Sequence, residues 1–114
     1  MSVKATTMDG GIGLIEASGS LVGGDETDDL RRSVLDFVNR EYKKLVIDLG
    51  QVTYVNSTAL GVLVSAHATY SRKEWQIKLC GINKNIKNMF VITKLTLVFD
   101  VQDSRDAAIK SFKP

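Results

Sequence analysis

The stretch LVIDLGQVTYVNSTALGVLVSAH, residues 45–67, contains the change of pattern that decides the fold. Its first half is an apolar run rich in β-branched residues, which is typical of a buried parallel strand. Its second half carries apolar residues at helical spacing, and this pattern extends to about Arg72. Between the halves lie Asn56, Ser57 and Thr58, where a tight turn needs only one or two such residues. The stretch predicts a strand, a polar junction and a helix.

The residues before this stretch predict a hairpin and a helix. Strands at residues 3–8 and 12–18 flank Asp9-Gly10-Gly11, which is a hairpin signal. Gly19 is expected to end the second strand, and SLVGG at 20–24 is expected to be a loop. Asp25 is expected to cap a helix that begins with an acidic first turn. This helix has one apolar stripe, formed by Leu30, Val34, Phe37 and Val38.

The residues after the stretch predict two more strands and two more helices. Alternation predicts a strand at 75–80, a helix begins near Lys84, and an apolar run predicts a short strand at 97–101. Asp103 or Ser104 is expected to cap the last helix. The chain at 1–114 is therefore expected to be a single α/β domain. It has a mixed sheet of four or five strands, with an N-terminal hairpin, right-handed β-α-β crossovers and about four helices.

Composition narrows the classes of function. The chain has 114 residues, of which 44% are apolar and 25% charged, as in an ordinary globular domain. Its net charge of +2 is too small to indicate the broad positive surface of a nucleic-acid-binding protein. No apolar stretch is long enough to span a bilayer. The single cysteine, Cys80, leaves no multi-cysteine metal site and is expected to be buried at a strand end. We expect a cytoplasmic protein with no metal, cofactor, nucleic-acid or membrane partner.

Several interpretations fit the junction at residues 56–58. Each of the three side chains can cap the following helix, but capping accounts for only one of them. Asn56-Ser57-Thr58 also fits a glycosylation sequon, which a cytoplasmic chain does not use. A nucleophilic Ser57 is disfavoured because the flanking glycines of a hydrolase elbow are absent. The sole histidine, His67, also lies about 15 Å further along the helix, so no catalytic residue is expected.

Phosphorylation is another use for Ser57. A serine at a helix N-terminus tolerates a phosphate, because the helix dipole and the free N–H groups favour an anion. The added charge of about −1.5 to −2 would then act on any protein surface that packs against the junction. A small nucleotide- or ligand-binding domain that uses these N–H groups is a further alternative, although the chain has neither a Walker A motif nor G-x-G-x-x-G.

The chain resembles STAS domains, in particular the bacterial anti-sigma factor antagonists. The resemblance rests on residues 45–67 and extends through SGSLVGGDETDDLRRSV and GINKNIKNMFVITKLTLVFDVQDSRDAAI, so that it covers nearly the whole chain. Three positions depart from the family motif. Its Asp is Asn56 here, its Gly is Ala59, and the Gly of a downstream Thr-Gly-Leu is Lys94.

The resemblance implies a binding protein and not an enzyme. In such antagonists the unphosphorylated protein binds an anti-sigma factor, which is also a serine kinase of the histidine-kinase-like ATPase type, and so frees the sigma factor. Phosphorylation weakens this complex, and a PP2C-type phosphatase restores it. Carried over to this chain, the phosphoacceptor is Ser57, with Thr58 as the less favoured one. The implied partner-binding residues are Leu21, Val22, Gly23, Gly24, Asp25, Asn56, Ser57, Thr58, Ala59 and Leu60.

Two further possibilities accompany this resemblance. A STAS domain can instead be a scaffold or interaction subunit of another signalling or transport complex, with no sigma factor involved. A weak homodimer is also possible.

Overall fold

The computed structural model describes residues 3–113, and in this part of the chain a five-stranded sheet carries four α-helices and one short 3-10 helix. The strands lie in the sheet in chain order; β1 is antiparallel to β2, and all other neighbours are parallel. This arrangement confirms the predicted α/β fold. The elements are β1 (Val3–Met8), β2 (Ile12–Leu21), α1 (Asp25–Asn39), β3 (Lys44–Val55), α2 (Ser57–Arg72), β4 (Gln76–Cys80), α3 (Lys84–Ile92), η1 (Leu95–Leu97), β5 (Val101–Gln102) and α4 (Arg105–Lys110).

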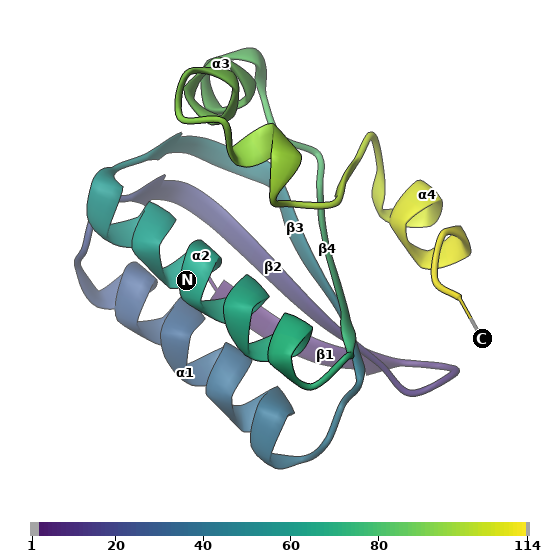
Figure 1. Cartoon of the computed structure of the whole chain (residues 1–114). Helices are drawn as coiled ribbons and strands as arrows, with labels where there is room; N and C mark the ends of the chain where they lie inside the picture. Colours follow the sequence, from purple (N-terminus) through teal and green to yellow (C-terminus); the bar gives the residue numbers. More distant parts are fainter. Residues whose placement is uncertain (1–2, 114) are drawn as a thin grey trace.

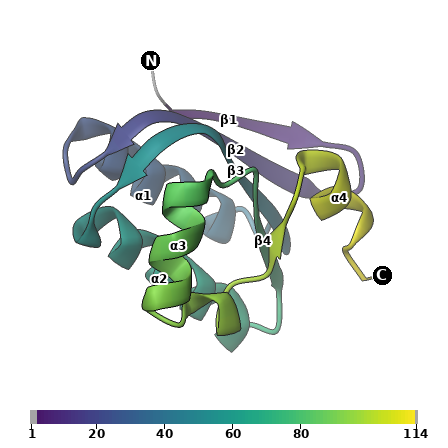
Figure 2. The same cartoon turned by 90° about the horizontal axis from the view of Figure 1, so that it is seen from above.

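Helices cover the two faces of the sheet unequally. Helices α1, α2 and α3 lie on one face, whereas the short α4 packs on the other (Figures 1 and 2). Alternating strand residues supply the two cores, because successive side chains of a strand point to opposite faces. Leu45 and Ile47 belong to the larger core with the predicted stripe of α1, and Val46 belongs to the smaller core under α4.

Strand β2 is longer than the sequence predicted. It continues through Gly19 to Leu21, whereas residues 20–24 were expected to be a loop. Two register shifts against β3, between Glu16 and Ser18 and between Gly19 and Ser20, allow this continuation. Gly19 has φ +81°, a left-handed conformation that glycine adopts at low cost in a bulge.

The final short strand begins later than predicted: it was expected at 97–101, and β5 comprises Val101–Gln102. Lys94, with φ +62°, ends α3, and the chain then forms η1 at Leu95–Leu97. Phe99 turns into the core, and only Val101 and Gln102 pair with β4. Within the run at 97–101, Phe99 is buried in the core, Leu97 and Val98 are exposed, and Val101 belongs to β5.

Two predictions about helix ends have opposite outcomes. Ser104 caps α4 as expected, since its hydroxyl accepts a hydrogen bond from Ala107 N–H at 3.1 Å. Asp25 does not cap α1. Gly24 occupies the cap position without a side-chain bond, and Asp25 is the first helical residue, where its carboxylate faces the positive end of the helix dipole.

Helices α1, α2 and α3 each end at a non-glycine residue in the left-handed region. These residues are Glu41, Glu74 and Lys94, with φ of 58°, 59° and 62°. This conformation is the usual end of a helix, but a residue with a Cβ atom adopts it at a cost of about 1 kcal/mol relative to Gly. Lys94 stands where the STAS motif has Gly. Glycine adopts the left-handed conformation at low cost, so the φ of +62° at this position explains why the family motif has Gly there.

The contact between Gly13 and Phe37 leads to a prediction about stability. A Cβ atom on Gly13 would lie 2.9 Å from the Phe37 ring, whereas one on the helical Gly61 would meet no atom within 4 Å. We expect Gly13→Ala to lower the free energy of unfolding by about 1–3 kcal/mol. The control Gly61→Ala is expected to raise it by about 0.5–1 kcal/mol. Urea denaturation measures both, and a Gly13→Ala variant as stable as wild type would contradict the close packing of α1 on β2.

Candidate functional site

The junction lies where β2 and β3 end together. The pairing of β3 with β4 stops at Asp48 and Cys80, but its pairing with β2 continues to Leu21 and Val55. The next backbone N–H, that of Asn56, donates to the carbonyl of Leu21 at 3.0 Å. The loop after β2 and the start of α2 therefore lie at the same edge of the sheet.

Asn56 is the residue that caps α2. Its Oδ1 accepts from Ala59 N–H at 3.0 Å, and its carbonyl accepts from Leu60 N–H at 2.9 Å. Ser57 and Thr58 follow in the first helical turn with exposed side chains, and neither hydroxyl makes a hydrogen bond within residues 3–113. The cap thus uses one of the three polar residues and leaves two hydroxyls free.

The loop of residues 21–25 packs against this first turn. Gly23, at φ +88°, donates its N–H to Thr27 Oγ1 at 2.9 Å, and a Cβ at this position would lie 3.3 Å from the methyl carbon of Thr58. Val22 is half exposed, and Gly24 is exposed. The structure thus brings together the two segments that the family resemblance implies for partner binding. One segment follows β2, and the other follows β3.

Not all of the expected contact residues present a side chain. Leu21 and Ala59 are fully buried, so they take part in the core instead of the surface. Leu60 is half-buried and packs on the larger core. The exposed part of the junction surface consists of Val22, Gly23, Gly24, Asp25, Ser57 and Thr58.

The charges around the junction come from α1. Residues 57–60 carry no charged side chain, whereas the first turn of α1 holds Asp25, Glu26 and Asp28. His67 lies in α2, where its Nε2 is 3.2 Å from Ser71 Oγ and its ring packs edge-on against Phe99. The contacts of His67 are therefore with Ser71 and Phe99 and not with Ser57.

Asn83 supports the exposed end of β3, a role that sequence analysis missed. Its Oδ1 caps α3 by accepting from Ile86 N–H at 2.8 Å. Its Nδ2 donates to the carbonyls of Val52 and Thr53 at 3.1 and 3.3 Å. These two residues lie in the part of β3 that extends beyond its pairing with β4. A cap could have been read from an asparagine before the apolar helix, but the contact with a strand 30 residues earlier could not.

A partly exposed ion-pair cluster connects α4 to the sheet, on the face opposite α1, α2 and α3. Arg105, the first residue of α4, donates to Asp48 Oδ2 from Nε at 3.1 Å and from Nη2 at 2.8 Å, and it also pairs with Glu16 at 3.0 Å. The hydrogen bond from Arg105 to Asp48 raises the pKa of the guanidinium above its usual value. This cluster joins α4 to β2 and β3, so we assign it to the fold.

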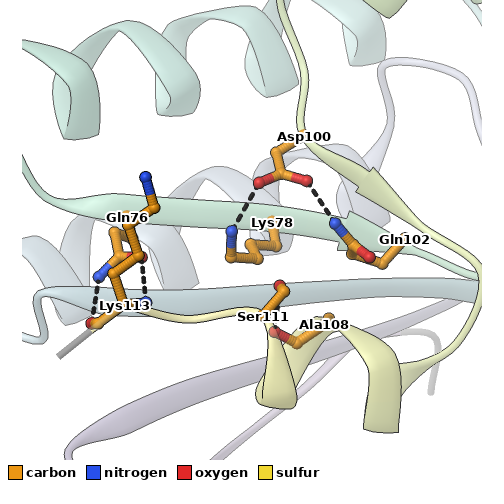
Figure 3. Close-up of polar contacts among 7 residues, drawn as sticks. All are labelled: Gln76, Lys78, Asp100, Gln102, Ala108, Ser111 and Lys113. Carbon is orange, nitrogen blue, oxygen red and sulfur yellow. Dashed lines mark hydrogen bonds and ion pairs between the residues drawn. The ribbon is translucent and has the colours of Figure 1, made fainter.

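The C-terminal segment is tied to β4 by a second polar network (Figure 3). Lys78 Nζ lies 2.5 Å from Asp100 Oδ2, and Gln102 donates to the other oxygen of Asp100 at 2.7 Å. Burial favours the protonated carboxyl, but the bonds from Lys78 and Gln102 outweigh it and lower the pKa of Asp100. Gln76 exchanges two hydrogen bonds of 2.9 Å with the backbone of Lys113.

Two features are absent from residues 3–113, one related to metal binding and one to membranes. No group of three or more His, Cys, Asp or Glu side chains is arranged to hold a metal ion. None of the described helices combines the length and apolar character that a bilayer span requires.

Comparison with known proteins identifies the family. A family model described as the STAS domain matches residues 4–108, and the chain belongs to this family. BtrV of Bordetella bronchiseptica, provisionally named an anti-sigma factor antagonist, is 27% identical over 100 residues, which cover 88% of this chain and 86% of BtrV.

Solved structures share the fold. A Thermotoga maritima protein, also provisionally named an anti-sigma factor antagonist, has a TM-score of 0.86 at 19% identity and covers 95% of this chain and 92% of its own. The Bacillus anti-sigma factor antagonist SpoIIAA matches in its unphosphorylated form with a TM-score of 0.77 at 8% identity, covering 97% and 100% of the two chains. Its phosphorylated form matches with 0.76 at 10% identity, covering 96% and 97%.

The Asn56 cap gives a prediction that separates two effects on stability: the hydrogen-bond acceptor at residue 56 and the charge of its side chain. Asn56→Ala removes the acceptor for Ala59 N–H and is expected to lower the free energy of unfolding by about 1 kcal/mol. Asn56→Asp keeps the acceptor and adds a negative charge at the helix N-terminus, so it is expected to be at least as stable as wild type. Thermal unfolding followed by circular dichroism compares them. Equal losses in both variants would contradict the capping role.

Cys80 gives a prediction about chemical reactivity. Its side chain is fully buried at the end of β4, as expected, and burial, with a smaller effect of Asp48, raises its pKa to about 12. The thiolate is the reactive form, so the native thiol is expected to react with a disulfide reagent at pH 8 at least about tenfold more slowly than a free cysteine. The same protein in concentrated guanidinium chloride is the control. Rapid reaction of the native protein would contradict this assignment.

Proposed function

We propose that the protein is an anti-sigma factor antagonist, and that phosphorylation of Ser57 switches its binding to a kinase-type anti-sigma factor. One observation carries the proposal: Ser57 begins α2 with an exposed hydroxyl that has no structural task, because Asn56 already caps the helix. In the unphosphorylated state the protein binds the anti-sigma factor and thereby frees the sigma factor. The names of its relatives add support.

The packing around Thr58 favours Ser57 as the phosphoacceptor. The methyl carbon of Thr58 lies close to Gly23, so this side chain is constrained by the loop of residues 21–25. Ser57 is exposed and is the first residue of α2. A kinase would therefore reach Ser57 without displacing the loop.

A phosphate on Ser57 would act on the partner and not on the fold. The free N–H groups of the first turn of α2 favour an anion. Residues 57–60 supply no cation, and the nearby α1 begins with carboxylates, so most of the added charge would face the partner. A partner surface that buries this charge without a counter-ion would lose several powers of ten in affinity, at about 1.4 kcal/mol per tenfold.

The proposed cycle needs two other enzymes. The anti-sigma factor supplies the ATP-dependent serine kinase, and a PP2C-type phosphatase restores the free hydroxyl. This protein contributes the substrate serine and the junction surface, and it catalyses neither step. We propose that the cycle operates in the cytoplasm.

Binding and labelling of three variants test this proposal. The kinase-type anti-sigma factor of the same organism is titrated with wild type, Ser57→Ala and Ser57→Asp, and labelling with radioactive ATP is followed. Wild type and Ser57→Ala are expected to bind equally, and only wild type is expected to be labelled. Ser57→Asp is expected to bind at least about tenfold more weakly, since it places a charge in the interface. Thr58→Ala is the matched control and is expected to be labelled like wild type.

Four outcomes would contradict parts of the proposal. Labelling of Ser57→Ala as strong as that of wild type would move the phosphoacceptor elsewhere. Equal binding by all three proteins would exclude a switch at Ser57. Failure of wild type to bind any anti-sigma factor, with capture of a transport ATPase instead, would support the scaffold alternative, and micromolar nucleotide affinity by calorimetry would support the ligand-binding one.

A further inference from the structure

The connections that leave the carboxyl ends of β4 and β5 go to opposite faces of the sheet. The chain after β4 enters α3 on the face of the larger core, whereas the chain after β5 enters α4 on the other face (Figures 1 and 2). In open α/β sheets a crevice forms at such a point, outside the carboxyl ends of the strands, and ligands bind there. The ends of β2 and β3 differ, because both lead to helices on one face.

A cleft of about 450 Å³ lies at this point of the sheet. Its volume falls within the range of about 300–1,000 Å³ that small-molecule sites occupy. The N–H of Leu79 donates to the carbonyl of Asp100 at 2.9 Å, which holds one wall of the cleft against β4. The cleft is lined by Ile82 from the connection after β4, Lys87 of α3, Thr96 of η1 and residues 99–103.

The cleft holds two charged side chains of opposite sign that are left unpaired within residues 3–113. Lys87 and Asp103 both line it, and neither forms an ion pair with the other or with any other described residue. The third charge, that of Asp100, is already engaged. Lys78 lies 2.5 Å from one of its oxygens, and Gln102 donates to the other at 2.7 Å (Figure 3). One cation and one carboxylate therefore stay available to a ligand.

The remaining wall of the cleft is apolar and fixed. Phe99 is only 6% exposed, and its ring packs against those of His67 and Phe90, with ring centroids 5.7 and 5.2 Å away. Ile82 and Val101 are half-buried and pack on the larger core. An apolar wall with a few polar groups is typical of sites that bind small molecules. Because the wall is preformed, a ligand would not have to order it.

We infer that this cleft binds a free α-amino acid with an apolar side chain. Its ammonium group pairs with Asp103, its carboxylate pairs with Lys87, and its side chain covers the apolar wall. A simple anion would leave Asp103 unpaired, and a simple cation would leave Lys87 unpaired, whereas a zwitterion satisfies both. The site goes beyond the proposed function and does not rest on it, since it includes none of residues 21–25 and 56–60.

Titration of the ¹⁵N-labelled protein with L-phenylalanine, followed by NMR, tests the inference. Saturable shifts are expected at the amides of residues 87, 96 and 99–103, with a dissociation constant of about 1 mM or lower. Phenethylamine lacks the carboxylate, and 3-phenylpropionate lacks the ammonium. Each is expected to bind at least about tenfold more weakly, because each loses one charge-assisted contact.

Two variants and two matched controls locate the site. Lys87→Gln and Asp103→Asn each remove one of the unpaired charges, and both are expected to bind L-phenylalanine at least about tenfold more weakly than wild type. Lys84→Gln on α3 and Asp106→Asn on α4 make the same changes at exposed positions that do not line the cleft. Both controls are expected to bind like wild type.

Three results would overturn the inference. The first is the absence of a saturable shift up to about 10 mM L-phenylalanine. The second is binding of either analogue as tight as that of L-phenylalanine, and the third is an equal loss of affinity in the control variants. Melting curves show whether each variant folds, and the analogues on wild type decide the matter if one does not. Binding of an anti-sigma factor enters none of these measurements, so failure here leaves the proposed function standing.

Discussion

The junction depends on the pairing of β2 with β3 beyond the last residue of β4. Along Gly50 to Val55, β3 has a strand on one side only, and on the other side Asn83 takes over two of its carbonyls. The two register shifts in β2 bring Leu21 level with Val55. If β2 slipped by one residue against β3, the buried side chains of β2 would turn to the other face of the sheet. The register is therefore fixed, and with it the level at which the two strands end. The position of Ser57 follows from this constraint.

The three polar residues that follow β3 have separate tasks. The side chain of Asn56 accepts from one N–H of the first turn of α2, that of Ala59, and its own N–H ties β3 to the end of β2. Thr58 packs against the loop at Gly23 and so fixes the second segment of the surface. Ser57 makes neither contact. Since capping and packing are already provided by its neighbours, the proposed phosphorylation of Ser57 would leave these two contacts in place.

The sequence predicted those elements whose periodicity is local. Residues 45–67 could be divided into strand, cap and helix because burial imposes one spacing on strands and another on helices. The end of β2 could not be predicted, since the Gly-Ser pair at 19–20 looks like a loop and only pairing with β3 makes it a strand. The run before Asp100 was misread because Phe99 alone is buried. The pair of Asp48 with Arg105, 57 residues apart, leaves no local pattern at all.

A rigid junction also decides how a signal can be carried. A phosphate at a flexible segment would act by ordering or melting it, but the turn around Ser57 is already fixed by the Asn56 cap, the Leu21 carbonyl and the loop contact at Gly23. In the proposed switch, charge is therefore the quantity that changes. Because charge acts only on a surface that approaches closely, the proposed switch requires a partner that removes water from around Ser57 when it binds.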